Sequence, residues 1–382
     1  MQRIIFWVSL GLVAYVYIGY PVLLWLVTGF AHDVKPSDSF RPNLTVIIPA
    51  HNEEGWIRKK IANTLELDYP SDRMQIIVAS DGSTDKTVEI ARPFASAGVE
   101  VAEFAQRVGK QEMLNRLAPE ARGDILVMTD SQVLLRPDSV SMLVRHFANP
   151  SVACVTGKRL CILQEGVVQG AGENLYWRYE SWIKESETRL HSCLGANGQL
   201  YAVRRSVFPR VERVGEDFYI PMKILATKRL RVIFEPKAIS MTPAAANLRI
   251  EFERKARAHV SFLLTLSLLK ELWNPGHPVW WQYISHHVLR MAVPVAMLTA
   301  LVSSVFLAKS SVFFRYTLVA QLCFYALAFL GYVFAKLDKR PKIFYVPFYF
   351  VFANLAIGQA LLRWPSRKYD YAWKRTERIP VS

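Results

Sequence analysis

The sequence predicts an α/β domain with a mostly parallel central sheet, flanked by helices that are long and apolar enough to cross a membrane. Between Asn43 and about Ser240, short apolar runs alternate with segments of helical period, the order typical of a parallel sheet with helices on both faces. On either side lie charge-free stretches close to the roughly 20 residues that a helix needs to cross a bilayer. The 382 residues, 52% of them hydrophobic, suffice for both parts.

The first apolar segment, Ile4 to Phe30, contains no charged residue. A cleaved signal peptide is the alternative, but this run exceeds the roughly 7–15 apolar residues of a signal core, so we favour a retained membrane anchor. We therefore assign residues 1–30 to an N-terminal transmembrane helix. Residues 31–43, which include the polar "VKPSDSFRPN", are assigned to a linker.

The α/β domain is assigned to residues 44–250. Its expected strands are short apolar runs: "LTVIIPA" (44–50), "MQIIVAS" (74–80), "VEVAEF" (99–104) and "DILVMTD" (124–130). Segments of helical period lie between them, at 53–67, 84–98 and 109–121.

Three of these strands end in polar loops that carry carboxylates: "PAHNEE" (49–54), "SDGSTD" (80–85) and "TDSQ" (129–132). One such loop is commonly a helix cap, and Thr84 or Asp85 suits that role. In parallel α/β sheets, however, ligands bind beyond the carboxyl ends of the strands. Three loops that meet at one edge therefore predict a ligand site.

Seven motifs in this chain resemble those of the family 2 glycosyltransferases, membrane-bound enzymes with the GT-A nucleotide-diphospho-sugar transferase fold that are related to cellulose, hyaluronan and poly-N-acetylglucosamine synthases. The resemblance covers Thr45 to about His259, together with one span before the domain and several after it. Each motif alone is weak evidence, but the presence of all seven in the order found in the family makes the resemblance specific. The motifs are "PAHNEE", "ASDGSTDKT", "GKQEMLN", "TDSQVLLRPD", "GANGQLYAVRR" (195–205), "GEDF" (215–218) and "RKARAH" (254–259).

The resemblance implies a nucleotide-sugar site, with a UDP-sugar as donor and Mg²⁺ or Mn²⁺ as cofactor. Asn52 and Glu53 would lie near the nucleoside, and Asp81 would hold the uracil or ribose. Lys110 would line the nucleotide pocket. Asp130 would be the first acid of the family's Asp-x-Asp motif, which binds the metal and the sugar nucleotide.

The same resemblance implies a catalytic centre in the second half of the domain. The segment that contains Gly195, Asn197 and Gly198 would form the floor under donor and acceptor, next to Glu216. Asp217 would be the catalytic base that takes the proton of the acceptor hydroxyl. The alternative for Asp217 is a helix N-cap, a position that aspartate favours. Direct attack without a covalent intermediate would invert the anomeric centre, so a β-linked product is expected.

Two arginines of the last motif, Arg254 and Arg257, would face the diphosphate. Glycosyl transfer builds negative charge on the departing diphosphate and an oxocarbenium-like sugar, so a cation and cationic side chains stabilise the transition state. The guanidinium fork suits this task because it can bind two phosphate oxygens at once.

The chain departs from the family pattern at two positions. Gln132 stands where many relatives have the second acid of Asp-x-Asp; its amide oxygen can still ligate Mg²⁺, so we expect a variant metal site made by Asp130 and Gln132. Processive relatives also carry Gln-x-x-Arg-Trp, whereas Ala258 follows Arg257 here. The missing tryptophan favours one or a few transfers over long-polymer synthesis.

After the domain, residues 251–284 are assigned to an amphipathic interfacial segment, with a buried core helix as the alternative, and 285–364 to transmembrane helices. The charge-free runs there are Met291–Ala308, Tyr316–Ala335 and Ile343–Leu362.

Basic clusters at 336–342 and in the 365–382 tail both indicate a cytoplasmic side. A full span between them would separate them, so either Ile343–Leu362 re-enters or lies shallow, or the span count is off by one.

The net charge of +15 is accompanied by no nucleic-acid-binding motif, and we expect membrane lipids to be the partner of these basic residues. The expected function is an inverting transfer from a UDP-sugar to a glycan or lipid-linked acceptor, on the cytoplasmic face of the plasma (inner) membrane, in surface polysaccharide or glycolipid synthesis. Transfer to polyprenyl phosphate and a catalytically silent nucleotide- or glycan-binding membrane partner remain as alternatives.

Overall fold

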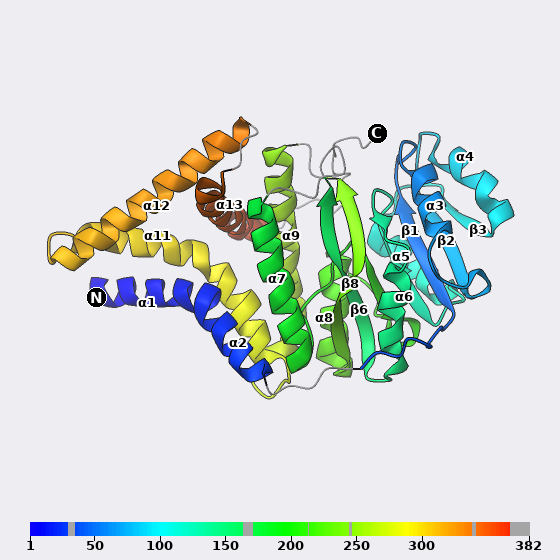
Figure 1. Ribbon diagram of the computed structural model, residues 1–382, viewed down its shortest axis with the longest axis horizontal. Helices are drawn as coiled ribbons and strands as arrows, with labels where there is room; N and C mark the ends of the chain where they lie inside the picture. The colour runs from blue at the N-terminus through cyan, green and yellow to red at the C-terminus, as the bar shows by residue number, and fades with distance from the viewer. Residues whose placement is uncertain (30–34, 163–170, 213, 244–246, 338–340, 367–382) are drawn as a thin grey trace.

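A computed structural model describes the chain except residues 30–34, 163–170, 213, 244–246, 338–340 and 367–382. An eight-stranded sheet occupies one end of the molecule and the long apolar helices occupy the other (Figure 1). The strand order is β3-β2-β1-β4-β7-β6-β8-β5.

The first half of the sheet is parallel, as predicted. It consists of β1 (Leu44–Ala50), β2 (Met74–Asp81), β3 (Val99–Phe104) and β4 (Ile125–Met128), with β1 paired between β2 and β4. Every residue of β1 is buried because its side chains alternate between two cores, with Val46 and Ile48 on one face and Ile47 on the other. The carboxyl ends of β1, β2 and β4 therefore meet at one edge.

The second half of the sheet is mixed. β7 (Tyr201–Arg204) runs antiparallel to both β4 and β6 (Val152–Ile162), while β8 (Arg231–Pro243) is parallel to β6. The short β5 (Leu134–Leu135) pairs antiparallel with β8 at the edge.

The predicted helices of the first half are present but shorter at their ends. α3 spans Ile57–Leu65 and α5 spans Lys110–Glu120. The segment expected to be helical over 84–98 divides into α4 (Thr87–Ala91) and a 3₁₀ turn (Arg92–Ala97). Pro93 lacks the amide hydrogen that an α-helix needs there, which explains the change of helix type.

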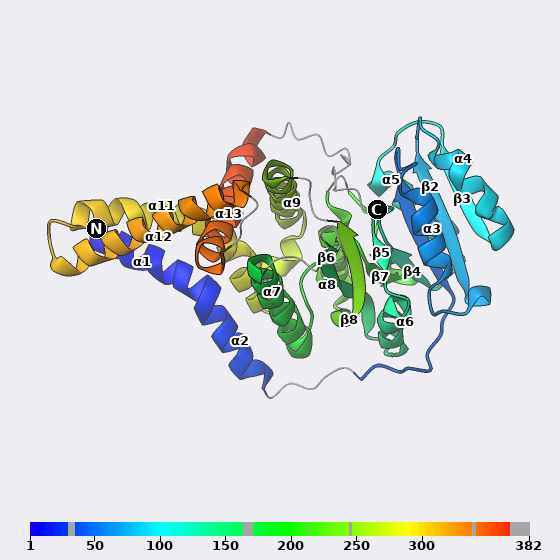
Figure 2. The same cartoon turned by 45° about the horizontal axis from the view of Figure 1, so that its top comes forward.

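Two long helices separate the sheet from the apolar part of the chain. They are α7 (Ala171–Leu190), which was not among the predicted helices, and α9 (Leu248–Leu268), and both stand between the two parts in both views (Figures 1 and 2). The shorter α6 (Ser139–Val144) packs on the sheet itself, and α8 (Glu216–Lys228) contacts both β8 and α9.

Among the described residues, four helical segments are long and apolar enough to cross a membrane. They are Gln2–Thr28, Trp280–Leu307, Val312–Lys336 (α12) and Lys342–Arg363 (α13). The first contains α1 (Gln2–Ala14) and α2 (Tyr20–Thr28), and the second contains α10 (Trp280–Gln282) and α11 (Leu289–Leu307).

The second segment, Trp280–Leu307, begins eleven residues before the charge-free run Met291–Ala308. Two polar side chains in this extra part are paired with side chains of α7. Arg290 Nη1 lies 2.7 Å from Glu180 Oε1, and His286 Nδ1 lies 2.8 Å from Glu187 Oε1. The two glutamates belong to α7, so this network ties α7 to the apolar helices.

α13 contacts both α7 and α9. In its first half, the rings of Tyr349 and Tyr176 lie 5.1 Å apart, and at its end Arg363 Nη1 lies 2.9 Å from Glu253 Oε2. Half of the residues in its most apolar 18-residue stretch are buried inside the protein, a larger share than in the other three segments.

Candidate active site

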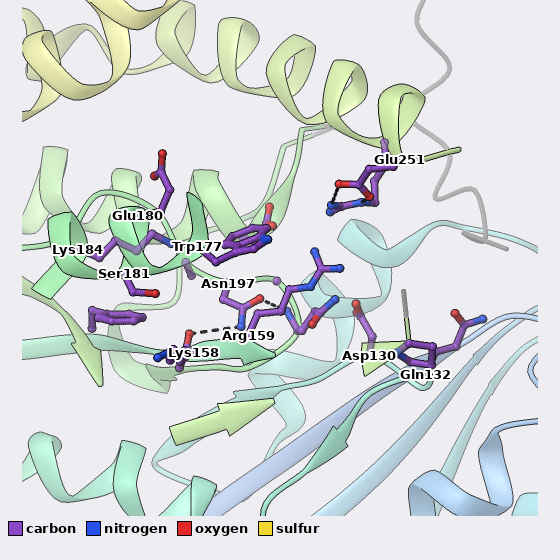
Figure 3. Close-up of a pocket in the computed structure, with 18 of the residues that line it drawn as sticks. Asp130, Gln132, Lys158, Arg159, Trp177, Glu180, Ser181, Lys184, Asn197 and Glu251 are labelled. Carbon is purple, nitrogen blue, oxygen red and sulfur yellow. Dashed lines mark hydrogen bonds and ion pairs between the residues drawn. The ribbon is translucent and has the colours of Figure 1, made fainter. Parts of the chain in front are cut away.

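A cavity of about 300 Å³ lies beyond the carboxyl ends of the strands, between the sheet and helices α7 and α9 (Figure 3). Residues from β6, α7, the loop before β7, α8 and α9 contribute to its lining. Seven of the predicted site residues line it: Glu53, Asp130, Gln132, Asn197, Gly198, Asp217 and Arg254. The other six, which lie behind the lining or away from it, are Asn52, Asp81, Lys110, Gly195, Glu216 and Arg257.

Asp130 follows β4 and forms an ion pair at the floor of the cavity. Lys110, the first residue of α5, places its Nζ 2.8 Å from Asp130 Oδ1 and 2.5 Å from Glu216 Oε1. Burial alone would lower the pKa of Lys110, but the two carboxylates outweigh it and raise that pKa. Lys110 is therefore a fixed cation that joins α5 to the start of α8.

The loop that carries Asp130 rests on a buried lysine that was not among the predicted site residues. Lys60 of α3 is fully buried, and its Nζ donates to Thr129 Oγ1 (2.9 Å) and to the carbonyl oxygen of Val133 (2.7 Å). Burial lowers the pKa of Lys60 to about 7, although Asp130 acts in the opposite direction. Sequence pattern reveals a helical lysine but not that it points inward.

Gln132 holds the carboxylate of Glu53. Its Nε2 donates to both oxygens of Glu53, at 2.9 and 3.0 Å, and both side chains are almost fully buried. The amide group of Gln132 thus faces Glu53, and an ionised side chain at position 132 would place two negative charges together. This contact gives a structural reason why a neutral residue stands at position 132. The role of Gln132 as a metal ligand stays a prediction.

Asp217 lies in the first turn of α8, with its side chain against Gly198. The N-cap of this helix is Gly215, so Asp217 does not occupy the cap position that was its structural alternative. A Cβ atom at Gly198 would lie 2.6 Å from Asp217 Oδ2, so only glycine leaves room for this carboxylate. Burial and the neighbouring Glu216 raise the pKa of Asp217 to about 7, against the opposing effect of Lys110.

The predicted floor is held by its own hydrogen bonds. Asn197 donates from its backbone amide to Thr156 Oγ1 (2.7 Å) and from Nδ2 to Ser240 Oγ (3.1 Å). Gly195 adopts φ +85°, and a Cβ there would lie 2.7 Å from the Phe218 ring. The segment is thus fixed against β6, β8 and α8.

Asp81 and Asn52 organise the loops behind the cavity. Asp81 is fully buried, and its carboxylate accepts from the backbone amides of Val108 (2.7 Å) and Gly109 (3.1 Å). Asn52 sits at φ +54°, and its Oδ1 accepts from the amide of Thr84 at 2.8 Å. Contact of either residue with a nucleoside remains a prediction.

Arg254 lines the cavity, but its fork is engaged. Its Nε and Nη2 donate to Glu251 at 3.0 and 2.7 Å, and Glu251 also lines the cavity. Burial alone would raise the pKa of Glu251, but Arg254 and Lys255 lower it to about 2. Arg257 does not line the cavity, so its contact with a diphosphate also remains a prediction.

The structure adds cavity residues that no motif indicated. They come from β6 and α7 and include Lys158, Arg159, Trp177, Ser181 and Lys184. Trp177 brings an aromatic ring to a cavity in a chain that lacks the tryptophan of processive relatives, since Ala258 follows Arg257. Only the packing of α7 across the end of the sheet places it there.

The residues around Asp130 fit a divalent cation that shares its ligands with a bound diphosphate. Lys110 engages Oδ1 of Asp130, while Oδ2 takes no hydrogen bond from any described residue. Within the described ranges, no group of three or more His, Cys, Asp or Glu side chains could hold a metal by itself. Oxygen ligands completed by phosphate and water are the surroundings that Mg²⁺ prefers.

The fold defines a class, the GT-A-like proteins, and the cavity lies beyond the strand ends of their mixed sheet. A solved structure, the mannosyltransferase PcManGT from Pyrobaculum calidifontis in complex with GDP-Man and Mn²⁺, aligns with a TM-score of 0.72 and 22% identity, covering 97% of this chain and 100% of that one. Residues 45–211 match the model of Glycosyl transferase family 2. These residues therefore constitute a glycosyl transferase family 2 domain.

Curated relatives resemble this chain over part of their length. The probable glycosyltransferase YdaM of Bacillus subtilis (strain 168) is 25% identical over 232 residues, which cover 56% of this chain and 54% of that protein. The beta-monoglucosyldiacylglycerol synthase of Nostoc sp. (strain PCC 7120 / SAG 25.82 / UTEX 2576) is 26% identical over 180 residues, or 46% and 38% of the two chains. This chain thus spans about half the length of the first relative and less of the second.

Proposed function

We propose that this protein is an inverting glycosyltransferase that moves a sugar from a UDP-sugar to a hydroxyl of a glycan or lipid-linked acceptor at the membrane, in surface polysaccharide or glycolipid synthesis. The observation that carries the proposal is the position of Asp217 in the same cavity as Asp130, with a pKa raised to about 7. A carboxylate with such a pKa is poised to accept a proton near neutral pH.

Each side chain has a defined task in this proposal. Arg254 binds and orients the donor diphosphate, and Asp217 takes the proton of the attacking hydroxyl. Lys110 holds Asp130 in place from behind the lining. A divalent cation bound at Asp130, with Gln132 nearby, would supply further positive charge for the leaving diphosphate. The close approach of Asp217 to Gly198 sets the base against the floor on which the acceptor would lie.

The base favours a hydroxyl acceptor over polyprenyl phosphate. A phosphate acceptor is already an anion and needs little help from a base, whereas a sugar hydroxyl needs proton removal during attack. A catalytically silent partner would have no use for a carboxylate kept at an elevated pKa, which costs folding free energy.

The donor is tested by offering radiolabelled sugars to purified protein in proteoliposomes. The panel contains UDP-glucose, UDP-galactose, UDP-N-acetylglucosamine and GDP-mannose, the last because the solved relative binds it. Products are separated by size and by lipid extraction, with and without Mg²⁺ or Mn²⁺. Transfer from a UDP-sugar supports the proposal; transfer from GDP-mannose alone would correct the donor, and nucleotide binding without turnover of any sugar would favour the silent partner.

We also place the catalytic domain on the cytoplasmic side, with α13 lying shallow along α7 and α9. The contacts of Tyr349 with α7 and of Arg363 with α9 support this placement, because a full span would carry one of these positions away from the two helices. Both basic clusters would then face anionic lipid on one side. Single cysteines at Lys336 and Val381, labelled with an impermeant maleimide in oriented vesicles, should react from the same side.

A further inference from the structure

The cavity carries uncompensated positive charge at the end that faces α7. Lys158 and Arg159 of β6 and Lys184 of α7, here called the basic subsite, all line it and are half-buried. In the described parts of the chain, none of the three forms an ion pair, and the buried Nε of Arg159 has no hydrogen-bond partner. The Arg159 guanidinium instead lies 5.5 Å from the centre of the Trp177 ring.

The acidic residues of this end are already neutralised by other cations. Glu180 lies 2.7 Å from Arg290, and Glu251 lies 2.7 Å from Arg254 and 3.8 Å from Lys255. Burial alone would raise the pKa of Glu180, but Arg290 and His286 hold it well below its usual range. Both carboxylates are already paired with other cations, although Glu251 also feels the charge of Arg159. Lys158 and Lys184, which form no ion pair with a described residue, therefore leave positive charge that favours an anionic ligand.

The two lysines of the basic subsite lie away from the place where the donor diphosphate is expected, and Arg159 lies between them and that place (Figure 3). Figure 3 shows Lys158, Ser181 and Lys184 at one end of the cavity and Asp130 and Gln132 at the other. The α7 end also adjoins the apolar part of the chain, because α7 packs against α2 and α13 (Figure 1). A ligand bound there could keep a lipid tail beside these helices.

We propose that the basic subsite binds a phosphate or diphosphate of the acceptor, so that the acceptor is an anionic, lipid-linked sugar. This inference rests on the proposed function and narrows its acceptor. The lipid phosphate stays bound as a spectator at Lys158, Arg159 and Lys184 while a sugar hydroxyl of the same molecule reaches Asp217. The phosphate fixes the distance between lipid and attacking hydroxyl, which accounts for a cavity with one anion site at each end.

The experiment compares two acceptors with the same sugar, one on a short polyprenyl diphosphate and one on an uncharged alkyl chain. With the donor identified in the panel above, wild-type protein should use the diphosphate lipid with a KM at least tenfold lower. Lys158→Gln and Lys184→Gln should each raise that KM about tenfold, the usual effect of losing one charge-assisted hydrogen bond. The KM for the donor, the KM for the uncharged acceptor and donor hydrolysis without acceptor should not change.

Arg178→Gln is the matched control, since Arg178 lies on the exposed side of α7 and does not line the cavity. Equal use of both acceptors, or variants that raise the donor KM instead, would overturn the inference; the second result would assign the anion to the donor diphosphate.

Binding gives a readout that does not depend on turnover. Without donor, the diphosphate lipid should raise the Tm of wild-type protein and of the control, but not that of Lys158→Gln/Lys184→Gln. Equal stabilisation of all three refutes the subsite even if transfer is never seen. Lack of transfer to either acceptor, with selective binding retained, counts against the proposed function alone.

Discussion

Replacing Asp217 by asparagine keeps the shape of the side chain and removes a negative charge from the cavity. The pKa of this carboxyl lies near 7 in the folded protein and near 3.8 when exposed, a difference worth about 4 kcal/mol for a fully buried group. Because Asp217 is only partly shielded from solvent in the cavity, we expect about half of that value, about 2 kcal/mol.

The direction with pH follows from the raised pKa. Below about pH 4 the group is protonated in the folded and unfolded states, so it contributes no difference; above about pH 7 it is ionised in both and its full cost applies. Without donor, wild-type stability should therefore fall as pH rises from about 4 to about 7. Asp217→Asn should gain stability relative to wild type over the same window, by a few degrees in Tm at high pH and by almost nothing at low pH.

The transferase activity of Asp217→Asn should fall, although its stability rises. Loss of a general base typically lowers the rate by about 10²–10⁴-fold, so Asp217→Asn should bind donor normally and fail to transfer to a hydroxyl. In the wild type, kcat/KM should rise with pH with a midpoint near 7, since this parameter reports the free enzyme.

Thermal unfolding across pH, donor binding and product formation measure the three effects on one preparation. A variant that turned over a hydroxyl acceptor at the wild-type rate, or whose Tm difference did not depend on pH, would refute the base assignment. Asp124→Asn, at the opposite end of β4, is a suitable control for a general effect of removing one carboxylate.

Three further substitutions test the donor end. Asp130→Ala should abolish metal-dependent donor binding, measured by calorimetry with and without Mn²⁺, and should leave Lys110 with one carboxylate partner instead of two. Gln132→Asp should lower the cation concentration needed for half-maximal activity if residue 132 is near the metal; an unchanged requirement would place residue 132 away from it. The same variant should lower stability above about pH 5, because the new carboxylate meets that of Glu53. Lys60→Met leaves the Val133 carbonyl without its donor, so we expect a loss of about 1–3 kcal/mol in unfolding free energy together with a raised donor KM; a raised KM without any loss of stability would contradict a supporting role.

Much of the fold could be predicted because its signals are local. β1 to β3 lie within one residue of their expected ends, since buried parallel strands read as short apolar runs between polar loops. Asp130 and Asp217 could be proposed as site residues because each belongs to a short motif, after a strand or at the start of a helix, and both line the cavity. The boundaries of the helix expected over 84–98 were less accurate, because Pro93 changes the helix type without removing the helical pattern.

The rest of the site depends on contacts between distant segments. Lys60 and Val133, or Gln132 and Glu53, are separated by more than 70 residues, and no spacing in the chain relates them. Likewise, His286 and Arg290 of Trp280–Leu307 pair with Glu187 and Glu180 of α7, about 100 residues away in the chain. Burial and ion pairing are properties of the assembled chain, so the protonation of Asp217 could not be inferred from its position in a motif.

The amino-acid sequence by itself determined the alternation of strands and helices, the apolar segments at both ends and the carboxylates that follow the strands, because periodicity and local polarity specify these features. Only the tertiary structure decided that α7 crosses the open end of the sheet and brings Trp177 and Lys184 opposite Asp130. The physical reason is that a helix buries whichever face finds complementary surface, and that surface here is assembled from strands and helices far apart in the chain.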